Sequence, residues 1–362
     1  MSIRIDPFTR TPGLAGKAYI DTGIADTIIA NFKSNDSGKH VYKITGLRGS
    51  GKSVEYGKVM QSLKEEKDWL VYNLSAAGNT VSTFLSLLSG EDFLRTHERT
   101  IEKSFRASIG GSMIGASGEG SIKITNTQDD NTFPKTDEAL IIRLIEKANK
   151  QNYKILVGID DISKTADSVK LLSIIGSMIV VGAELYLIVT GLSENIEKFS
   201  SEKNLTFFKR ADSIEASVLN KYDIVAKYQT LLGIDAAEAR KIEKATNDYA
   251  YAYQVLGSLY FDKKGNQTLE DLIPTFENIM FKDSYDMIWK TLTEGEKEMV
   301  RCICRSKNGQ IDDIKAQMKN PSSYNVFRSK LINKHLVNGS KRGYLQIDLP
   351  RFQNFVELWG DD

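Results

Sequence analysis

The chain has 362 residues, more than one ordinary domain needs, which predicts two or three domains. Its hydrophobic content of 41% and charged content of 26% are typical of globular proteins, so a disordered chain is not expected. The net charge of +1 excludes a chain that is basic overall, so only the local distribution of charge can indicate a nucleic-acid partner.

Three features indicate a reduced, cytoplasmic protein without a membrane span. Cys302 and Cys304 stand two apart with no second pair, and the three histidines are scattered, so neither a disulfide framework nor a zinc site is expected. The first ten residues lack the apolar core of a signal peptide. The most apolar window, 171–189, divides into a piece with helical spacing and a short strand-like run, which argues against a transmembrane helix.

The clearest motif follows an amphipathic helix predicted over 20–32 and a strand that ends at Thr45. Between this strand and the next predicted helix, the sequence matches G-x-x-x-x-G-K-[ST] at every fixed position. The candidate nucleotide-binding residues are Gly46, Leu47, Arg48, Gly49, Ser50, Gly51, Lys52, Ser53 and Val54. Glycines let backbone N–H groups surround phosphate oxygens, Lys52 can reach the β- and γ-phosphates, and the Ser53 hydroxyl can bind Mg²⁺. The motif therefore predicts a site for a nucleoside triphosphate with Mg²⁺.

A second strand is predicted over 69–74, after which the chain departs from a compact nucleotide-binding pattern between about 81 and 135. Within that stretch, residues 108–125 are rich in glycine and serine, and small residues alternate with apolar ones. This composition favours a loose hairpin or a mobile loop. We therefore expect an insertion at 81–135 that is available to a protein partner.

An acidic pair completes the predicted site. An amphipathic helix over 136–150 precedes a nearly continuous apolar run, 153–159, which is typical of a parallel strand buried on both faces. The run ends in Asp160 and Asp161. A carboxylate at the end of such a strand can hold Mg²⁺ beside the Ser53 hydroxyl, so Asp160 is the candidate metal ligand. Asp161 is the candidate general base that orients the attacking water.

Two further residues are candidates for catalysis. The strand predicted over 185–189 ends at Thr190, whose side chain could contact the γ-phosphate or the water, although an ordinary strand-end threonine is nearly as well supported. Arg210 lies just before the last predicted strand and could reach the nucleotide of a neighbouring copy, with a surface ion pair as the commoner alternative. Alternating strands and helices over 40–216 predict right-handed βαβ units and a parallel sheet.

Residues 291–348 follow a helical stretch and have the pattern of a winged helix-turn-helix. Three helices are predicted, one capped at Thr293 and the others over 311–318 and 324–335. A small hairpin around the turn 338–343 comes next. The arrangement predicts a module that can place its third helix in a DNA groove.

The charge of this module supports a DNA partner. Between Arg301 and Gly343 there are ten Lys and Arg but only two Asp, which indicates a phosphate-binding face. The candidate DNA-binding residues are Ser322, Ser323, Asn325 and Arg328 of the third helix, with Lys341 and Arg342 at the tip of the wing. The alternative is a winged helix that packs against proteins.

In the order of its motifs, the whole chain resembles ATP-binding proteins of the AAA+/STAND group, close to the archaeal origin-recognition-type ATPases. The resemblance rests on Asp6-Pro7-Phe8-Thr9, Leu14-Ala15-Gly16-Lys17, Gly46–Ser53, Ile159-Asp160-Asp161, Val189-Thr190-Gly191, Ala245–Ala250 with Gln254, Phe327-Arg328 with Leu331, and Gly343 with Pro350 and Phe352. It implies an α/β fold, namely a P-loop NTPase core with a parallel sheet flanked by helices. The expected domains are this core (1–216), a helical lid (217–282) and a winged-helix domain (283–362).

The resemblance also implies roles for residues that their spacing alone does not assign. The front segment packs near adenine in such proteins, so Ala15, Gly16 and Lys17 are candidate base-pocket residues. The lid usually carries G-x-P or an arginine, and Asp248-Tyr249-Ala250 has neither, so we assign no second sensor. Asp161 stands where motor ATPases commonly have glutamate, which implies slow hydrolysis.

The expected function is therefore a cytoplasmic, Mg-ATP-dependent DNA-binding switch with slow ATPase activity. Double-stranded DNA is the expected partner, together with a nucleotide-dependent homo-oligomer. The alternative is a STAND-like signalling or defence ATPase whose winged helix contacts proteins.

Overall fold

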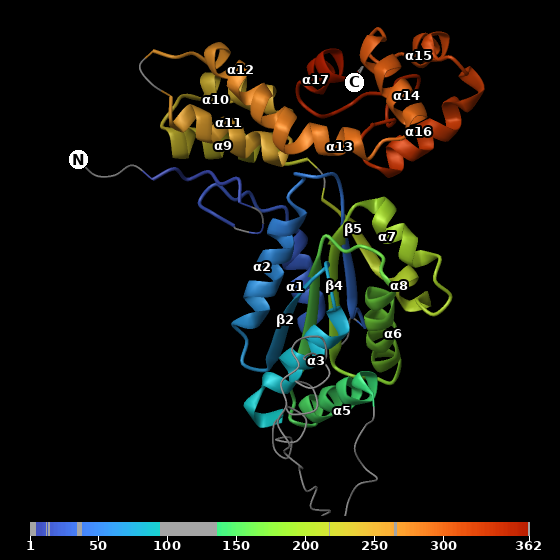
Figure 1. Cartoon of the computed structure of the whole chain (residues 1–362). Helices are drawn as coiled ribbons and strands as arrows, with labels where there is room; N and C mark the ends of the chain where they lie inside the picture. The colour runs from blue at the N-terminus through green and yellow to red at the C-terminus, as the bar shows by residue number, and fades with distance from the viewer. Residues whose placement is uncertain are drawn as a thin grey trace, which may run out of the picture.

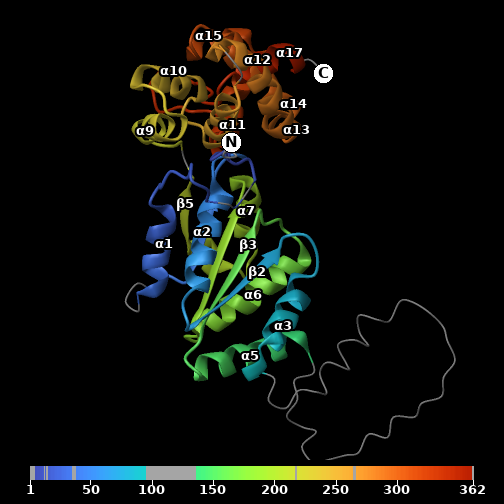
Figure 2. The same ribbon diagram turned by 90° about the vertical axis from the view of Figure 1, so that its left-hand side faces the viewer.

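A computed structural model describes residues 5–11, 13, 15–34, 38–94, 136–216, 218–263 and 266–360. Figure 1 shows an α/β part that carries the sheet and a helical part that lies beyond one end of the strands. The N-terminal segment runs between the two parts (Figures 1 and 2). The glycine- and serine-rich stretch 108–125 lies outside the described residues.

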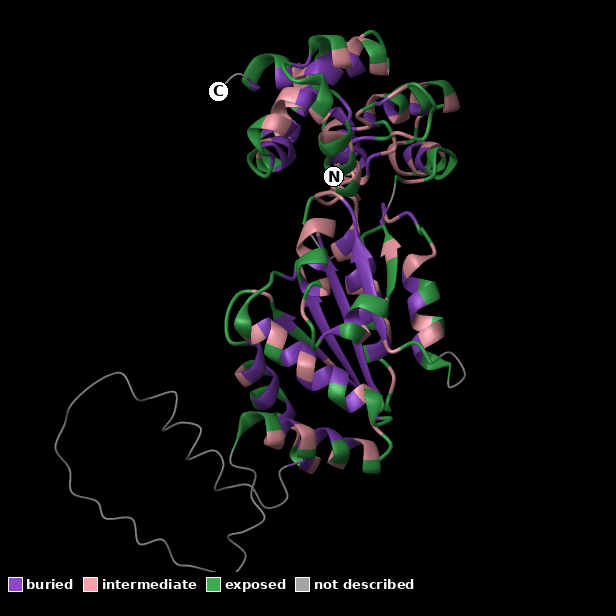
Figure 3. Cartoon of the chain, turned by 90° about the vertical axis from the view of Figure 1, so that its right-hand side faces the viewer, coloured by how far each residue is buried: buried purple, intermediate pink, exposed green. Residues whose placement is uncertain are grey.

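The sheet is the centre of the α/β part. Its strands are β1 (Val41–Thr45), β2 (Trp69–Ser75), β3 (Lys154–Asp160), β4 (Leu185–Gly191) and β5 (Asp212–Glu215). They are all parallel and lie in the order β2-β3-β4-β1-β5. Every residue of β1 and β4 is buried, as expected for central strands that are covered on both faces (Figure 3). The prediction of a parallel sheet flanked by helices is confirmed.

Helices cover both faces of the sheet. One face packs against α1 (Ile24–Lys33) and α2 (Lys52–Lys64). The helices on the other side are α3 (Thr80–Gly90), α5 (Asp137–Lys150), α6 (Ala166–Val180), α7 (Ser193–Ser200) and α8 (Thr206–Arg210). The apolar window 171–189 therefore divides between α6 and β4. In the described part of the chain, no helix is long and apolar enough to cross a membrane.

The prediction that an insertion starts at about residue 81 is wrong. α3 occupies residues 80–90, and its Phe84, Leu85 and Leu88 are buried in the same hydrophobic cluster as β2 and α5. A short 3-10 turn, η1 (Asp92–Leu94), continues this packing through the buried Leu94. The apolar residues of α3 recur at helical spacing, and they belong to the core. The remainder of the predicted insertion, 95–135, lies outside the described residues.

The helical part has one continuous core. Its first helices are α9 (Lys221–Leu232), α10 (Ala236–Thr246), α11 (Ala250–Phe261) and α12 (Leu269–Met280). A π-helical turn, η2 (Phe281–Tyr285), joins α12 directly to α13 (Asp286–Lys290). The expected boundary between lid and winged helix at 282/283 falls inside this continuous helical segment. Buried residues from α9 to the C-terminal helix form a single hydrophobic cluster.

The C-terminal helices follow the predicted order. They are α14 (Glu294–Arg305), α15 (Ile311–Gln317), the 3-10 turn η3 (Pro321–Ser323), α16 (Tyr324–Asn333) and α17 (Phe352–Trp359). The predicted hairpin is reduced to one isolated antiparallel bridge, Asn338 to Gln346, and a second bridge joins Tyr344 to Gln310, which precedes α15. The last helix, α17, was not expected from the sequence, and it packs Phe352 and Phe355 against Tyr285.

Candidate nucleotide-binding site

The loop between β1 and α2 has the backbone of a phosphate cradle. Gly46, Gly49 and Gly51 all have positive φ angles, which favour glycine. A Cβ at Gly49 would lie 2.4 Å from the Tyr249 hydroxyl, so this position also needs glycine for close packing. The buried Lys52 donates hydrogen bonds to the carbonyls of Gly46 (2.9 Å) and Leu47 (2.6 Å). Burial lowers the pKa of Lys52 to about 8.

The acidic pair meets the loop at the ends of β3 and β4. The Ser53 hydroxyl donates a hydrogen bond to Asp160 Oδ1 at 3.1 Å. Asp161 adopts a left-handed backbone conformation (φ 51°), and its side chain pairs with the Arg48 guanidinium at 3.6 Å. The structure thus brings Ser53 together with the adjacent pair Asp160 and Asp161, which lies far from it in the sequence.

Thr190 lies in this cluster, but its hydroxyl is already engaged. The side chain is fully buried and donates a hydrogen bond to Asp160 Oδ1. The same hydroxyl accepts a hydrogen bond from the Asp161 N–H at 2.9 Å. Thr190 therefore positions the two acids in this structure, and the direct γ-phosphate contact that we predicted for it is not part of this arrangement.

A cavity of about 840 Å³ extends from the phosphate loop to the helical part. Its walls include Thr9–Thr11, Tyr19 and Ile20 of the N-terminal segment, with Tyr253 and Gln254 of α11. The Thr9 N–H donates a hydrogen bond to Gln254 Oε1 (2.9 Å), which joins these two walls. The cavity has the mixed polar and apolar lining that a nucleotide needs.

The candidate base-pocket residues Ala15, Gly16 and Lys17 are not among the residues that line this cavity, and their role stays a prediction. All three are exposed. The chain turns here, since the Tyr19 N–H bonds the Gly16 carbonyl at 3.0 Å, and the Lys17 carbonyl accepts a hydrogen bond from Lys227 on α9. This turn leaves residues 15–17 at the surface, and the residues that follow it, Tyr19 and Ile20, lie in the cavity wall.

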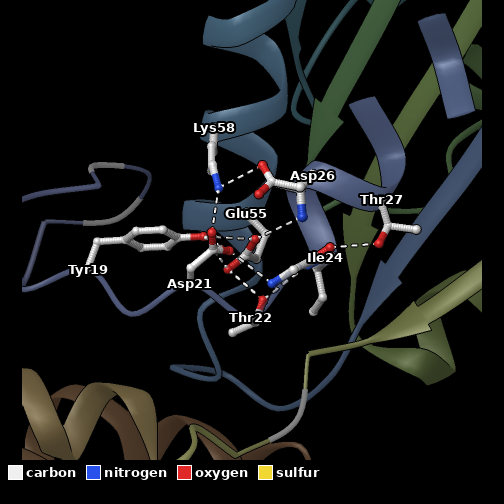
Figure 4. A network of polar contacts seen from close by, with 10 residues as sticks. Tyr19, Asp21, Thr22, Ile24, Asp26, Thr27, Glu55 and Lys58 are labelled. Carbon is white, nitrogen blue, oxygen red and sulfur yellow. Dashed lines mark hydrogen bonds and ion pairs between the residues drawn. The ribbon is translucent and has the colours of Figure 1, made fainter. Parts of the chain in front are cut away.

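Glu55 fastens the N-terminal segment to α2 (Figure 4). Its buried carboxylate accepts hydrogen bonds from the Tyr19 hydroxyl (3.1 Å), the Thr22 hydroxyl (3.0 Å) and the Ala25 N–H (3.1 Å). Burial raises the pKa of Glu55. Nearby, Lys58 pairs with two aspartates of the same segment. Sequence reasoning missed this network, because a single glutamate on a helix gives no local signal of its distant partners.

Gly57 of α2 lets the N-terminal segment lie close to this helix. A Cβ at Gly57 would lie 2.4 Å from the Gly13 carbonyl oxygen. We expect Gly57→Ala to displace the N-terminal segment and lower the free energy of unfolding by about 1–3 kcal/mol, with weaker nucleotide binding. Gly90→Ala is the matched control, because a Cβ there meets nothing within 4 Å. Thermal unfolding and nucleotide titration measure both effects, and equal behaviour of the two variants would contradict the prediction.

The start of α11 contacts the phosphate loop directly. The Tyr249 hydroxyl is buried, lies 3.2 Å from the Ser284 hydroxyl and donates a hydrogen bond to the Arg48 carbonyl. The Tyr251 N–H donates one to the Gly49 carbonyl at 3.0 Å. Residues 248–250, to which we assigned no second sensor, and the adjacent Tyr251 therefore contact the phosphate loop through the Tyr249 hydroxyl and the Tyr251 N–H.

Arg210 lies away from this cluster. It is the exposed last residue of α8, outside the cavity wall, and β5 begins two residues later at Asp212. Asp212 pairs with Tyr42 near the beginning of β1, whereas the phosphate loop follows the other end of β1. Any action of Arg210 on a nucleotide would thus concern a neighbouring copy, and this role stays a prediction.

The candidate DNA-binding residues lie on η3, α16 and the following turn. Ser322, Asn325, Lys341 and Arg342 are exposed, while Ser323 and Arg328 are half-buried. The Arg328 guanidinium lies against the turn, where a Cβ at Gly339 would come within 2.8 Å of it. These side chains come from three neighbouring segments of one module.

The C-terminal end of α16 is docked on the α/β part. Lys334 pairs with Glu194 of α7 at 3.3 Å and with Glu296 of α14 at 3.2 Å. His335 contacts Glu215 of β5 at 2.5 Å and the Ser193 hydroxyl at 2.6 Å. The winged-helix module is therefore tied to the two strand ends that flank β1.

The parallel sheet, the glycine-rich loop and the acid at the end of β3 define the P-loop NTPase class of folds. Residues 282–356 match a family model described as a domain of unknown function, DUF8462. Comparison with curated proteins gives no match.

Solved structures resemble the whole chain. The Walker-type ATPase PABY2304 of Pyrococcus abyssi has 12% identity and a TM-score of 0.60, covering 97% of this chain and 99% of that one. The ORC2 protein of Aeropyrum pernix has 14% identity and a TM-score of 0.51, covering 100% and 96%. A STAND protein of Pyrococcus horikoshii, PH0952, has 16% identity and a TM-score of 0.39, covering 98% and 44%. The first two matches show that this chain shares its fold with these two proteins.

Proposed function

We propose that this chain binds Mg-ATP, hydrolyses it slowly, and uses the nucleotide to control DNA binding by its winged helix in the cytoplasm. The observation that carries the proposal is the meeting of Ser53 and Asp160 beside the phosphate loop, at one end of a cavity of about 840 Å³. The named matches support it: one is described as a Walker-type ATPase, and the other was solved as ADPNP-ADP complexes.

The residues of the site fit a nucleotide. Ser50 Oγ is buried in the loop and has no hydrogen-bond partner within the described part of the chain, so a phosphate oxygen could satisfy it. The positive φ angles of the loop glycines suit a cradle of N–H groups. Lys52 would bind the β- and γ-phosphates from its buried position.

The oxygen donors of Ser53 and Asp160 fit Mg²⁺, which prefers hydroxyl, carboxylate and phosphate oxygens. When bound, Mg²⁺ would neutralise charge on the transferred phosphoryl group. Thr190 would hold the Asp160 carboxylate, and Asp161 would orient water. Since the Asp161 side chain is shorter than the glutamate common in motor ATPases, we expect this base to be poorly placed and turnover to be slow.

Removal of Mg²⁺ tests the metal-binding part of the proposal. We expect ATP affinity, measured by calorimetry, to fall about tenfold or more when EDTA removes Mg²⁺, because the charge of the phosphates then lacks a counterion. Asp160→Asn and Ser53→Ala should remove most of this dependence on Mg²⁺. Asp167→Asn is the control, because Asp167 binds Thr80 and lies outside the cavity wall. A Mg²⁺ effect that is undiminished in both site variants would contradict the assignment.

The DNA-binding part of the proposal rests on charge and exposure. Lys341 and Arg342 extend from the turn, and Ser322 and Asn325 are exposed at the start of the third helix of the module. This combination supports contact with phosphates at the wing and with a groove at the helix. A nucleotide-dependent homo-oligomer that uses Arg210 is a secondary part of the proposal. A protein partner at the remainder of the predicted insertion, 95–135, is another.

One observation favours the alternative, a signalling or defence ATPase whose winged helix contacts proteins. The docking of Lys334 and His335 on the α/β part shields one end of the third helix. Duplex DNA binding that is absent at low salt in the presence of ATP, or that lacks a steep dependence on salt, would favour this alternative.

A further inference from the structure

Arg48 joins two parts of the site that come from distant segments. Its guanidinium pairs with Asp161 at 3.6 Å, and both side chains line the cavity. Its carbonyl accepts a hydrogen bond from the buried Tyr249 hydroxyl at the start of α11. The residue is therefore held between the acidic pair and the lid.

The surroundings fix both members of the ion pair. The Thr190 hydroxyl accepts a hydrogen bond from the Asp161 N–H, and this contact sets the backbone of Asp161 at the end of β3. On the other side, the neighbouring Gly49 carbonyl accepts a hydrogen bond from the Tyr251 N–H. The Arg48 backbone is thus anchored, while its guanidinium is partly exposed beside the cavity.

This pair lies at the end of the site where a third phosphate would be bound. Lys52 and Ser53 follow the loop at the start of α2, and Ser53 contacts Asp160, the neighbour of Asp161. The Arg48 and Asp161 side chains are 39% and 56% exposed, so their ion pair is weak and can be replaced. A phosphate group carries more charge than a carboxylate and suits the planar guanidinium, which donates two parallel hydrogen bonds.

We propose that Arg48 is a γ-phosphate ligand supplied from within the same chain, and that it makes the site prefer ATP to ADP. The γ-phosphate competes with Asp161 for the guanidinium, and its binding releases the Asp161 carboxylate to orient water. Arg48, rather than only the backbone of the loop, then distinguishes a triphosphate from a diphosphate. This inference rests on the proposed nucleotide site.

Calorimetric titration of the full chain with Mg²⁺ and either AMP-PNP or ADP tests the inference. We expect Arg48→Ala to weaken AMP-PNP binding by about 10- to 100-fold, the loss of a charged hydrogen bond, and to change ADP binding less than about threefold. Arg48→Lys should recover part of the difference. Asp161→Asn should strengthen AMP-PNP binding, because the competing charge is removed, and this gain should vanish when it is combined with Arg48→Ala.

The controls separate this inference from the proposed function. Arg240→Ala removes an exposed arginine of α10 and should bind both nucleotides as the wild type does. Thermal unfolding of each variant monitors folding. Equal loss of AMP-PNP and ADP binding in Arg48→Ala, or no loss of either, would overturn the γ-phosphate role. A wild-type chain that binds neither nucleotide would overturn the proposed function together with this inference.

Discussion

Lys52→Ala is expected to lower ATP affinity and phosphate release by about 100-fold or more, which is the typical cost of removing a fixed charge that stabilises a reacting phosphate. Lys52 is buried at the start of α2, and its ammonium group bonds the carbonyls of the phosphate loop. Alanine removes the cation without adding bulk. Calorimetry measures binding, and a phosphate-release assay measures turnover.

Lys64→Ala is the matched control for this prediction. Lys64 is exposed at the other end of the same helix, so its removal should leave both readouts unchanged. Phosphate release that persists at the wild-type rate in Lys52→Ala would show that the activity comes from a contaminating ATPase. Unchanged ATP affinity would contradict the assignment of the phosphate loop.

Reversing the charge of the wing, with Lys341→Glu and Arg342→Glu together, is expected to weaken duplex DNA binding about tenfold or more at moderate salt. Both side chains are exposed at the turn, where they can contact phosphates. Each lost contact should reduce the slope of log affinity against log salt by about 0.9. Fluorescence anisotropy across a salt series measures the affinity and the slope in one experiment.

An equivalent reversal on α10 controls for net charge. Arg240→Glu with Lys241→Glu changes an adjacent, exposed basic pair in the same way and lies outside the winged helix. We expect its DNA affinity to stay close to that of the wild type. If both double variants lose affinity equally, DNA is attracted by the overall charge, and the wing has no special role.

Local signals in the sequence predicted the parts of the fold that depend on neighbouring residues. The phosphate loop has a fixed spacing, β3 is a continuous apolar run that ends in two acids, and α14 starts at a capping box built from Thr293 and Glu296. Parallel strands place their ends together, so the meeting of Ser53 with Asp160 followed from the order of the elements.

Contacts set by tertiary packing could not be predicted in this way. The turn at Gly16 decides that Tyr19 faces the cavity, whereas the resemblance placed Ala15–Lys17 there. Thr190 was correctly placed at a strand end, yet its hydroxyl is engaged by the two acids. The Arg48 ion pair depends on the left-handed backbone of Asp161, which no local pattern indicates.

Control of DNA binding by the nucleotide can be tested in one titration. Fluorescence anisotropy of a labelled duplex of mixed sequence at low salt would compare the wild-type chain with Mg²⁺ and AMP-PNP, with Mg²⁺ and ADP, and without nucleotide. We expect the DNA affinities with AMP-PNP and with ADP to differ about tenfold or more, which corresponds to a coupling free energy of about 1.4 kcal/mol or more. Equal affinities in all three conditions would contradict it.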